Sequence, residues 1–134
     1  MAVTRTRAAL AVQHATLSAA HVTDVLGLAP TESFDTGDAY ARDTRTRTHS
    51  AWSLESPSDD PSLEVQLRAL LDLVDSRGPA LRALAAQGFQ LTWTCWVEED
   101  DGDGAWSLTS ALLRDLGALP VDLWFDSYAD TERS

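Results

Sequence analysis

The chain has 134 residues, of which 44% are hydrophobic and 23% charged, and its formal net charge at pH 7 is −11. This length and composition are typical of one globular domain, which we place at residues 1–134, and a single cysteine, Cys95, excludes an internal disulfide. Residues 1–54 are charge-balanced, whereas residues 55–134 carry sixteen acids and five arginines, a field that disfavours nucleic acid and anionic membranes and favours basic partners.

Residues 7–14 are rich in small apolar side chains with weak alternation, which predicts a first strand. A helix is predicted next, because Thr16 or Ser18 can cap its first turn and apolar residues then recur at helical spacing. Gly27 suits the left-handed residue that follows a helix.

The next stretch, residues 31–50, is polar and irregular, and Gly37-Asp38 within it indicates a turn. Alternating residues then predict a second strand near 47–55. The sequence "SPSDDP" ends this strand.

The strongest helical pattern covers residues 61–76. Asp59 or Asp60 is expected to cap this helix, and Pro61 suits its first position. Its buried stripe is expected to comprise Leu63, Leu67, Leu70, Leu71 and Val74. A short second helix is predicted for residues 79–86, between two glycines.

The clearest strand covers residues 89–99, which alternate strictly. Its apolar face comprises Phe89, Leu91, Trp93, Cys95 and Val97. Its opposite face comprises Gln90, Thr92, Thr94, Trp96 and Glu98. We expect helices to cover the apolar face.

The chain then predicts a third helix, capped by Ser107 or Thr109 and ending before Gly117. Its inward residues are expected to be Leu112, Leu113 and Leu116. A last strand is predicted for residues 121–128, and the tail 129–134 is expected to fray.

An internal repeat organises these elements. Residues 17–30, "LSAAHVTDVLGLAP", match residues 108–120, "LTSALLRDLGALP", with one gap, and each is flanked by strands. The tetrapeptide "AWSL", which occurs twice, falls out of register in the two halves and is no duplicated site. Two β-α-β halves joined by a helical linker predict an α+β, ferredoxin-like split β-α-β sandwich with a mainly antiparallel sheet and helices on one face.

The ordered motifs "LGLAPT", Gly37-Asp38, "AWSLES", a leucine-rich helix, "LTSALLRDLGA" and a final "DSY" resemble a small bacterial family, the domain of unknown function numbered four-two-seven-nine. The resemblance covers nearly the whole chain and implies a single domain, with no activity attached. It gives Gly37, Asp38, Trp52 and Tyr128 as the recognisable positions. Where the family often has a basic residue before Gly-Asp, this chain has Thr36.

An acidic loop invites a calcium interpretation. Glu99, Asp101 and Asp103 alternate, and Gly104 takes the sixth place of a calcium loop. The twelfth place, where a bidentate glutamate belongs, is Ser110. We therefore expect a solvated turn and no metal site.

No catalytic constellation is visible either. The histidines lack ligand spacing, and no nucleophile elbow or P-loop is present. Cys95 alternates with core residues, where a thiol is usually inert. We expect no catalytic residue and no cofactor, although an unrecognised enzyme remains a third hypothesis.

The remaining pattern is aromatic. Alternation puts Trp96, Trp124, Asp126 and Tyr128 on the sheet face opposite the apolar one, where large rings beside acids are typical of a binding patch. The alternative is that residues 31–50 or the linker helix fold over these rings as a second small core. With the family positions added, the candidate binding residues are Gly37, Asp38, Trp52, Trp96, Trp124, Asp126 and Tyr128.

The leading functional hypothesis is a small, acidic, non-enzymatic binding protein that recognises a basic protein partner, as inhibitors and immunity proteins do. The alternative is a small-molecule sensor or carrier with a pocket between the sheet and residues 31–50. No apolar run approaches the roughly 18 residues of a membrane span or makes a signal peptide, so we expect a cytoplasmic protein. The oligomeric state is left open.

Overall fold

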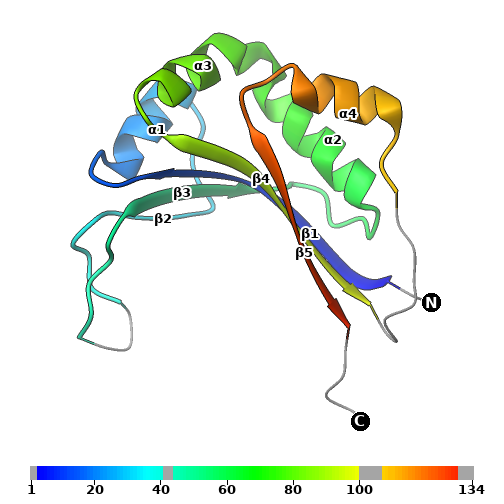
Figure 1. Cartoon of the computed structure of the whole chain (residues 1–134), viewed down its shortest axis with the longest axis horizontal. Helices are drawn as coiled ribbons and strands as arrows, with labels where there is room; N and C mark the ends of the chain where they lie inside the picture. The colour runs from blue at the N-terminus through cyan, green and yellow to red at the C-terminus, as the bar shows by residue number, and fades with distance from the viewer. Residues whose placement is uncertain (1–2, 41–43, 100–106, 130–134) are drawn as a thin grey trace.

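The computed structural model describes residues 3–40, 44–99 and 107–129. They form an α+β fold in which one curved five-stranded sheet carries the helices together on one face (Figure 1). The elements are β1 (Val3–His14), α1 (Ala19–Leu26), β2 (Glu32–Phe34), β3 (Ser50–Glu55), α2 (Leu63–Val74), a 3-10 turn (Asp75–Arg77), α3 (Gly78–Ala86), β4 (Gln90–Glu99), α4 (Ser110–Gly117) and β5 (Asp122–Ala129). Among the described residues, no helix has the length and apolar character needed to cross a membrane.

The sheet is mixed, with strand order β2-β3-β1-β4-β5. The central strand β1 pairs antiparallel with β3 and β4, and β2 pairs antiparallel with β3. β4 and β5 are parallel neighbours joined through α4.

The split ferredoxin-like arrangement predicted from the repeat is wrong. A split unit leaves another strand between the two strands that its helix joins. Here β4 and β5 lie side by side, and β1 and β3 are direct antiparallel neighbours. The first half differs because the chain passes through β2 and a hairpin before it enters β3, so β3 returns antiparallel to β1.

Serine hydroxyls cap the first turns of α1 and α2. The Ser18 hydroxyl accepts from the His21 amide, and Gly27 ends α1 in the left-handed region with φ 70°. Helix α2 is capped by Ser62, whose hydroxyl accepts from the Val65 amide, so the prediction of an aspartate cap is wrong.

Helix α4 is capped by Thr109, one of the two predicted residues, and it includes Gly117 as its last residue. Leu112 and Leu116 of α4 are buried as predicted, whereas Leu113 is 46% exposed and does not point inward.

The core lies between the helices and one face of the sheet. It contains the apolar face of β4, the alternate residues of β1 and the leucine stripe of α2, all as the periodicity predicts. Its largest members are Leu10, Trp52, Leu67, Leu70, Leu81, Leu84, Trp93 and Leu112.

Glu64 at the start of α2 holds the start of α4. Its carboxylate accepts from the Thr109 amide and from the Thr109 hydroxyl, each at 2.8 Å. These bonds, the amide first and then the hydroxyl, lower the pKa of Glu64 below its ordinary value of 4.5, and Arg68 adds to the effect.

The Glu64–Thr109 link is therefore expected to depend on pH. Because the pKa is lowered on folding, its stabilisation is fully present above pH 4.5 and is lost as the pH falls through the lower, folded-state value. The measurement is the melting temperature of the parent and of Glu64→Gln across this range. The gap between the two should shrink as the pH falls below 4.5. A gap that is constant with pH would contradict the assignment.

Cys95 lies on the helix-covered face of β4 and is 1% exposed. Burial raises the pKa of its thiol to about 12. We expect no labelling of the native protein by an aromatic disulfide reagent at mildly alkaline pH, and stoichiometric labelling in denaturant, because the thiolate is the reactive form. Rapid labelling of the native protein would show that this face of β4 opens.

Candidate functional site

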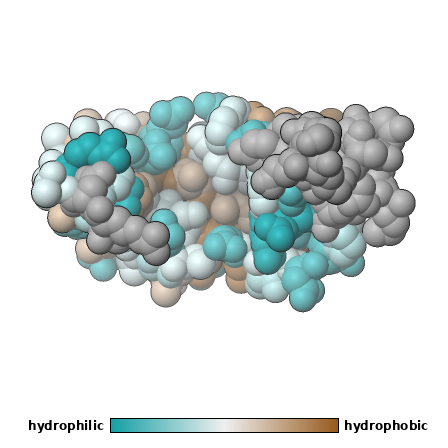
Figure 2. Space-filling view, turned by 90° about the horizontal axis from the view of Figure 1, so that it is seen from below, coloured by the Kyte–Doolittle hydropathy of each residue, from teal (hydrophilic) through white to brown (hydrophobic). Residues whose placement is uncertain are grey.

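The sheet face opposite the helices is open in its centre, where small side chains form the floor. Alternate residues of the three central strands, β3, β1 and β4, point to this face, and their short side chains make its surface lie close to the backbone. These residues are Ala9, Ala11, Ala51, Ser53, Thr92 and Thr94. Figure 2 looks onto this face and shows a hollow with an apolar base between more polar walls. Residues 35–40 and 44–49 project on the same side of the sheet (Figure 1).

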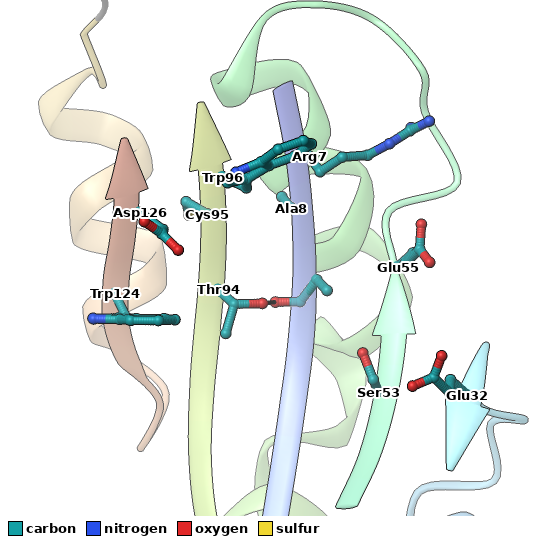
Figure 3. Close-up of a pocket in the computed structure, with 11 residues that line it drawn as sticks. Arg7, Ala8, Glu32, Ser53, Glu55, Thr94, Cys95, Trp96, Trp124 and Asp126 are labelled. Atoms are coloured by element: carbon teal, nitrogen blue, oxygen red, sulfur yellow. Dashed lines mark hydrogen bonds between the residues drawn. The ribbon is translucent and has the colours of Figure 1, made fainter. Parts of the chain in front are cut away.

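A hollow of about 420 Å³ lies at one end of this face. Trp96, Trp124 and Asp126 line it from β4 and β5, and Glu32, Ser53 and Glu55 line it from β2 and β3 (Figure 3). Between these walls lie Ala9, Thr94 and Arg7. Ala8 and Cys95 also border it, but both are buried under the helices and therefore contribute main-chain atoms.

A second hollow of about 610 Å³ adjoins the first. The two share Thr94 and Trp124, so they form one continuous depression, which we call the trough. The second hollow is lined by Ala11, Gln13, Gln90, Thr92, Thr94, Asp122, Leu123 and Trp124. From Arg7 to Gln13 along β1 the trough is about 20 Å long, by the rise of a strand.

The trough is negatively charged. Its first hollow has three carboxylates, those of Glu32, Glu55 and Asp126, against the one guanidinium of Arg7, and its second hollow has Asp122. The acids lie on both walls, because Glu32 and Glu55 come from the β2–β3 side and the aspartates from β5. An electropositive ligand would therefore meet carboxylates from two directions.

The structure brings together three of the residues that alternation placed on this face: Trp96, Trp124 and Asp126. Trp124 is 56% exposed, so it does not pack into a second core. Tyr128 lies on β5 with Glu98 as its β4 partner, and its side chain is outside the described residues.

Trp52 lies elsewhere. It faces the helices, is fully buried, and donates from its indole nitrogen to the Thr23 hydroxyl at 3.0 Å. The prediction that Trp52 joins the binding patch is wrong, because β3 turns the face that bears Ser50 and Trp52 towards α1.

Gly37 and Asp38 form the predicted turn but do not line the trough. Gly37 has φ 91°, and the Asp38 carboxylate accepts from the Asp35 amide at 2.8 Å. Asp35 in turn accepts from the Ala19 amide at the start of α1, so this turn is anchored to the helix layer. Its described contacts are structural.

The opposite wall and the floor of the trough were not predicted from the sequence. Glu32 and Glu55 come from strands that are short or flanked by polar residues, so neither stood out. The floor had a readable signal, because Arg7, Ala9, Ala11 and Gln13 alternate with buried residues of β1. Small residues on an outward face give no hydrophobic pattern, so the floor of the trough was not predicted from them.

The described residues hold no group of three or more histidine, cysteine or acidic side chains placed to bind a metal ion. Most of the acidic loop considered for calcium, residues 100–106, lies outside the described residues. His14 is occupied by the fold: its Nδ1 accepts from the amides of Thr16 and Leu17, and its Nε2 lies 3.2 Å from the Gln87 carbonyl. The trough offers rings, carboxylates and amides, which are the components of a binding site.

Comparison with known proteins identifies a family. Residues 4–130 match the model of a family described as a domain of unknown function, DUF4279. No curated protein and no solved structure matches the chain. The match covers nearly the whole chain and agrees with the resemblance seen in its motifs. The chain therefore belongs to the DUF4279 family.

Proposed function

We propose that this protein binds another protein, taking a basic, extended segment of it into the trough. The observation that carries the proposal is the trough itself, a depression with a floor of small residues, an exposed tryptophan and carboxylates on both walls. A role as an inhibitor or immunity protein, which needs binding without catalysis, is consistent with it. The lone, buried thiol also fits a reducing cytoplasm, which we include in the proposal.

The shape of the trough favours an extended chain. Its two hollows join at Thr94 and Trp124, and together they run along β1 and β4. A length of about 20 Å accommodates about six residues in the extended conformation. A compact ligand would fill one hollow and leave the other empty.

The charge of the protein favours a basic segment. The whole chain carries −11, and the trough walls repeat that sign locally. Charge of one sign along a groove speeds the arrival of an oppositely charged partner and excludes nucleic acid.

A small molecule is the second candidate, because each hollow has the volume of a ligand pocket, which is typically about 300–1,000 Å³. The first hollow also offers groups of both signs, Arg7 against Glu32 and Glu55, which suits a small zwitterion. β2 supplies Glu32, so part of residues 31–50 does border this hollow.

The test is capture from a lysate of the source organism, with the trough filled by mutation. Ala11→Phe puts a ring on the floor without changing charge, and Ala111→Phe makes the same change on an exposed position of α4. We expect the parent and Ala111→Phe to retain a basic protein in equal stoichiometry, and Ala11→Phe to release it. Circular dichroism checks that both variants are folded.

A metabolite that is extracted from the parent and from Ala111→Phe but not from Ala11→Phe would show that the ligand of the trough is a small molecule and not a protein. A captured protein that Ala11→Phe still retains would place the interaction outside the trough and contradict the proposal.

A further inference from the structure

Arginines of this chain lie over its aromatic rings at several places. The Arg5 guanidinium lies 5.5 Å from the centre of the Trp96 ring, and Arg47 lies 3.8 Å from Phe34 and 4.0 Å from Tyr40. Arg5 also approaches the Glu98 carboxylate at 3.8 Å. Around Trp96 the fold thus combines a ring, a cation and a carboxylate on the open side of the sheet.

Trp124 has the same surroundings without the cation. The residue is 56% exposed, no described arginine lies over its ring, and no described ring stacks on it. Its neighbours across the sheet are small, because Trp124 pairs with Thr94, and Thr94 pairs with Ala9. The face of the indole that looks into the trough is therefore open (Figure 3).

Carboxylates lie on both sides of this open ring along β5. Asp122 and Asp126 lie two residues before and after Trp124 on the same face of the strand, whereas Glu55 is three strands away on the opposite wall. Arg7 does not take the vacant place, because its side chain extends towards the far end of β3, away from Trp124 (Figure 3). A neutral apolar group on this ring would take water from the Asp122 carboxylate and give it no opposite charge, whereas a cation would supply that charge.

We propose that Trp124, with Asp122, is a subsite for one guanidinium or ammonium group of the partner. The cation lies on the indole face, which attracts it through the ring quadrupole, and the Asp122 carboxylate supplies the opposite charge. This inference rests on the proposed function and identifies the chemical group that the trough selects. A partner segment would then place one arginine or lysine beside Trp124, where the two hollows meet.

The experiment uses two small probes of nearly the same shape, butylguanidinium chloride and butylurea, which differ in charge. Each is titrated into isotopically labelled protein, and the Trp124 indole and β5 main-chain signals are followed by NMR. We expect butylguanidinium to shift these signals saturably and butylurea to bind at least about tenfold more weakly, because only the first gains the cation–π and ionic terms. Added salt should weaken butylguanidinium binding.

Variants locate the subsite. Trp124→Ala should abolish the saturable shifts of the β5 main chain, and Asp122→Asn should weaken butylguanidinium binding by about threefold or more. Asp24→Asn makes the same charge change on an exposed position of α1 and should leave binding unchanged.

Equal binding of the two probes, or unchanged butylguanidinium binding by Trp124→Ala, would overturn the subsite. Its failure is separate from that of the proposed function, because a partner released by Ala11→Phe would still show that the trough binds. Conversely, specific butylguanidinium binding without any captured protein would support the subsite and contradict the proposal of a protein partner.

Discussion

Replacing Gln66 with leucine is expected to lower the free energy of unfolding by about 2–5 kcal/mol, since each buried polar group left unpaired costs about 1–3 kcal/mol. Gln66 lies in α2 and is 1% exposed. Its Oε1 accepts from the Ala8 amide at 2.8 Å, and its Nε2 donates to the Thr6 carbonyl at 2.7 Å. Leucine fills a similar volume but leaves both main-chain groups of β1 without a partner.

The reason for this bond lies in the sheet. The pairing of β1 with β3 ends at Ala9 and Glu55, so residues 6–8 of β1 have no strand on that side. The Gln66 amide takes the place of the missing strand and offers one acceptor and one donor, as a peptide group does. The helix layer and the central strand are joined at this point by hydrogen bonds as well as by apolar contact.

Urea unfolding followed by circular dichroism measures the effect. Gln90→Leu is the matched control, because Gln90 is exposed on β4, and it should change stability by less than about 0.5 kcal/mol. Similar urea midpoints for Gln66→Leu and the parent would mean that the Ala8 amide and the Thr6 carbonyl find other partners. The Gln66 amide would then not take the place of a strand.

Gln66 shows where sequence reasoning stops. The leucine stripe of α2 was predicted from its period, and the structure buries it. Gln66 lies beside Leu67 and Leu70 on that stripe, and a polar residue there could be noticed. The role of Gln66 could not be predicted, because that role depends on how far β3 extends along β1. The extent of this pairing is a property of the folded sheet.

The strand order could not be predicted from the sequence for a similar reason. Strands β4 and β5 are joined through one helix, α4, and such a crossover unit can form adjacent parallel strands. Residues 27–49 separate α1 from β3, and a connection of that length lets the chain turn back. The repeat predicted two equal halves because local patterns describe the elements and not the path between them.

The candidate site was partly predictable. Period-two alternation correctly places Trp96 and Trp124 on the face opposite Trp93, because both strands have one clearly apolar side. Trp52 was included because of the family resemblance and not because of its alternation, and the small or polar residues around it in β3 mark neither face as buried. The opposite wall, with Glu32 and Glu55, appears only when β2 and β3 are placed beside β1.

Trp52→Ala is the second large effect that we expect, a loss of about 3–5 kcal/mol in the free energy of unfolding, as for other buried large-to-small changes. Trp52 is fully buried between β3 and the helix layer, and its indole N–H donates to Thr23 of α1. The substitution leaves a cavity and frees that hydroxyl. Trp52→Phe should cost less, because it keeps most of the ring and loses the hydrogen bond.

The control is Trp124, an exposed tryptophan that lines the trough. Trp124→Ala should change stability by less than about 1 kcal/mol, because Trp124 is 56% exposed and its removal opens no cavity. Unfolding in urea for the three variants, with partner capture measured well below their midpoints, separates stability from binding. Trp52→Ala that stays folded should still capture the partner, whereas Trp124→Ala should not. A stable Trp52→Ala protein that no longer binds would return Trp52 to the binding site and contradict its assignment to the core.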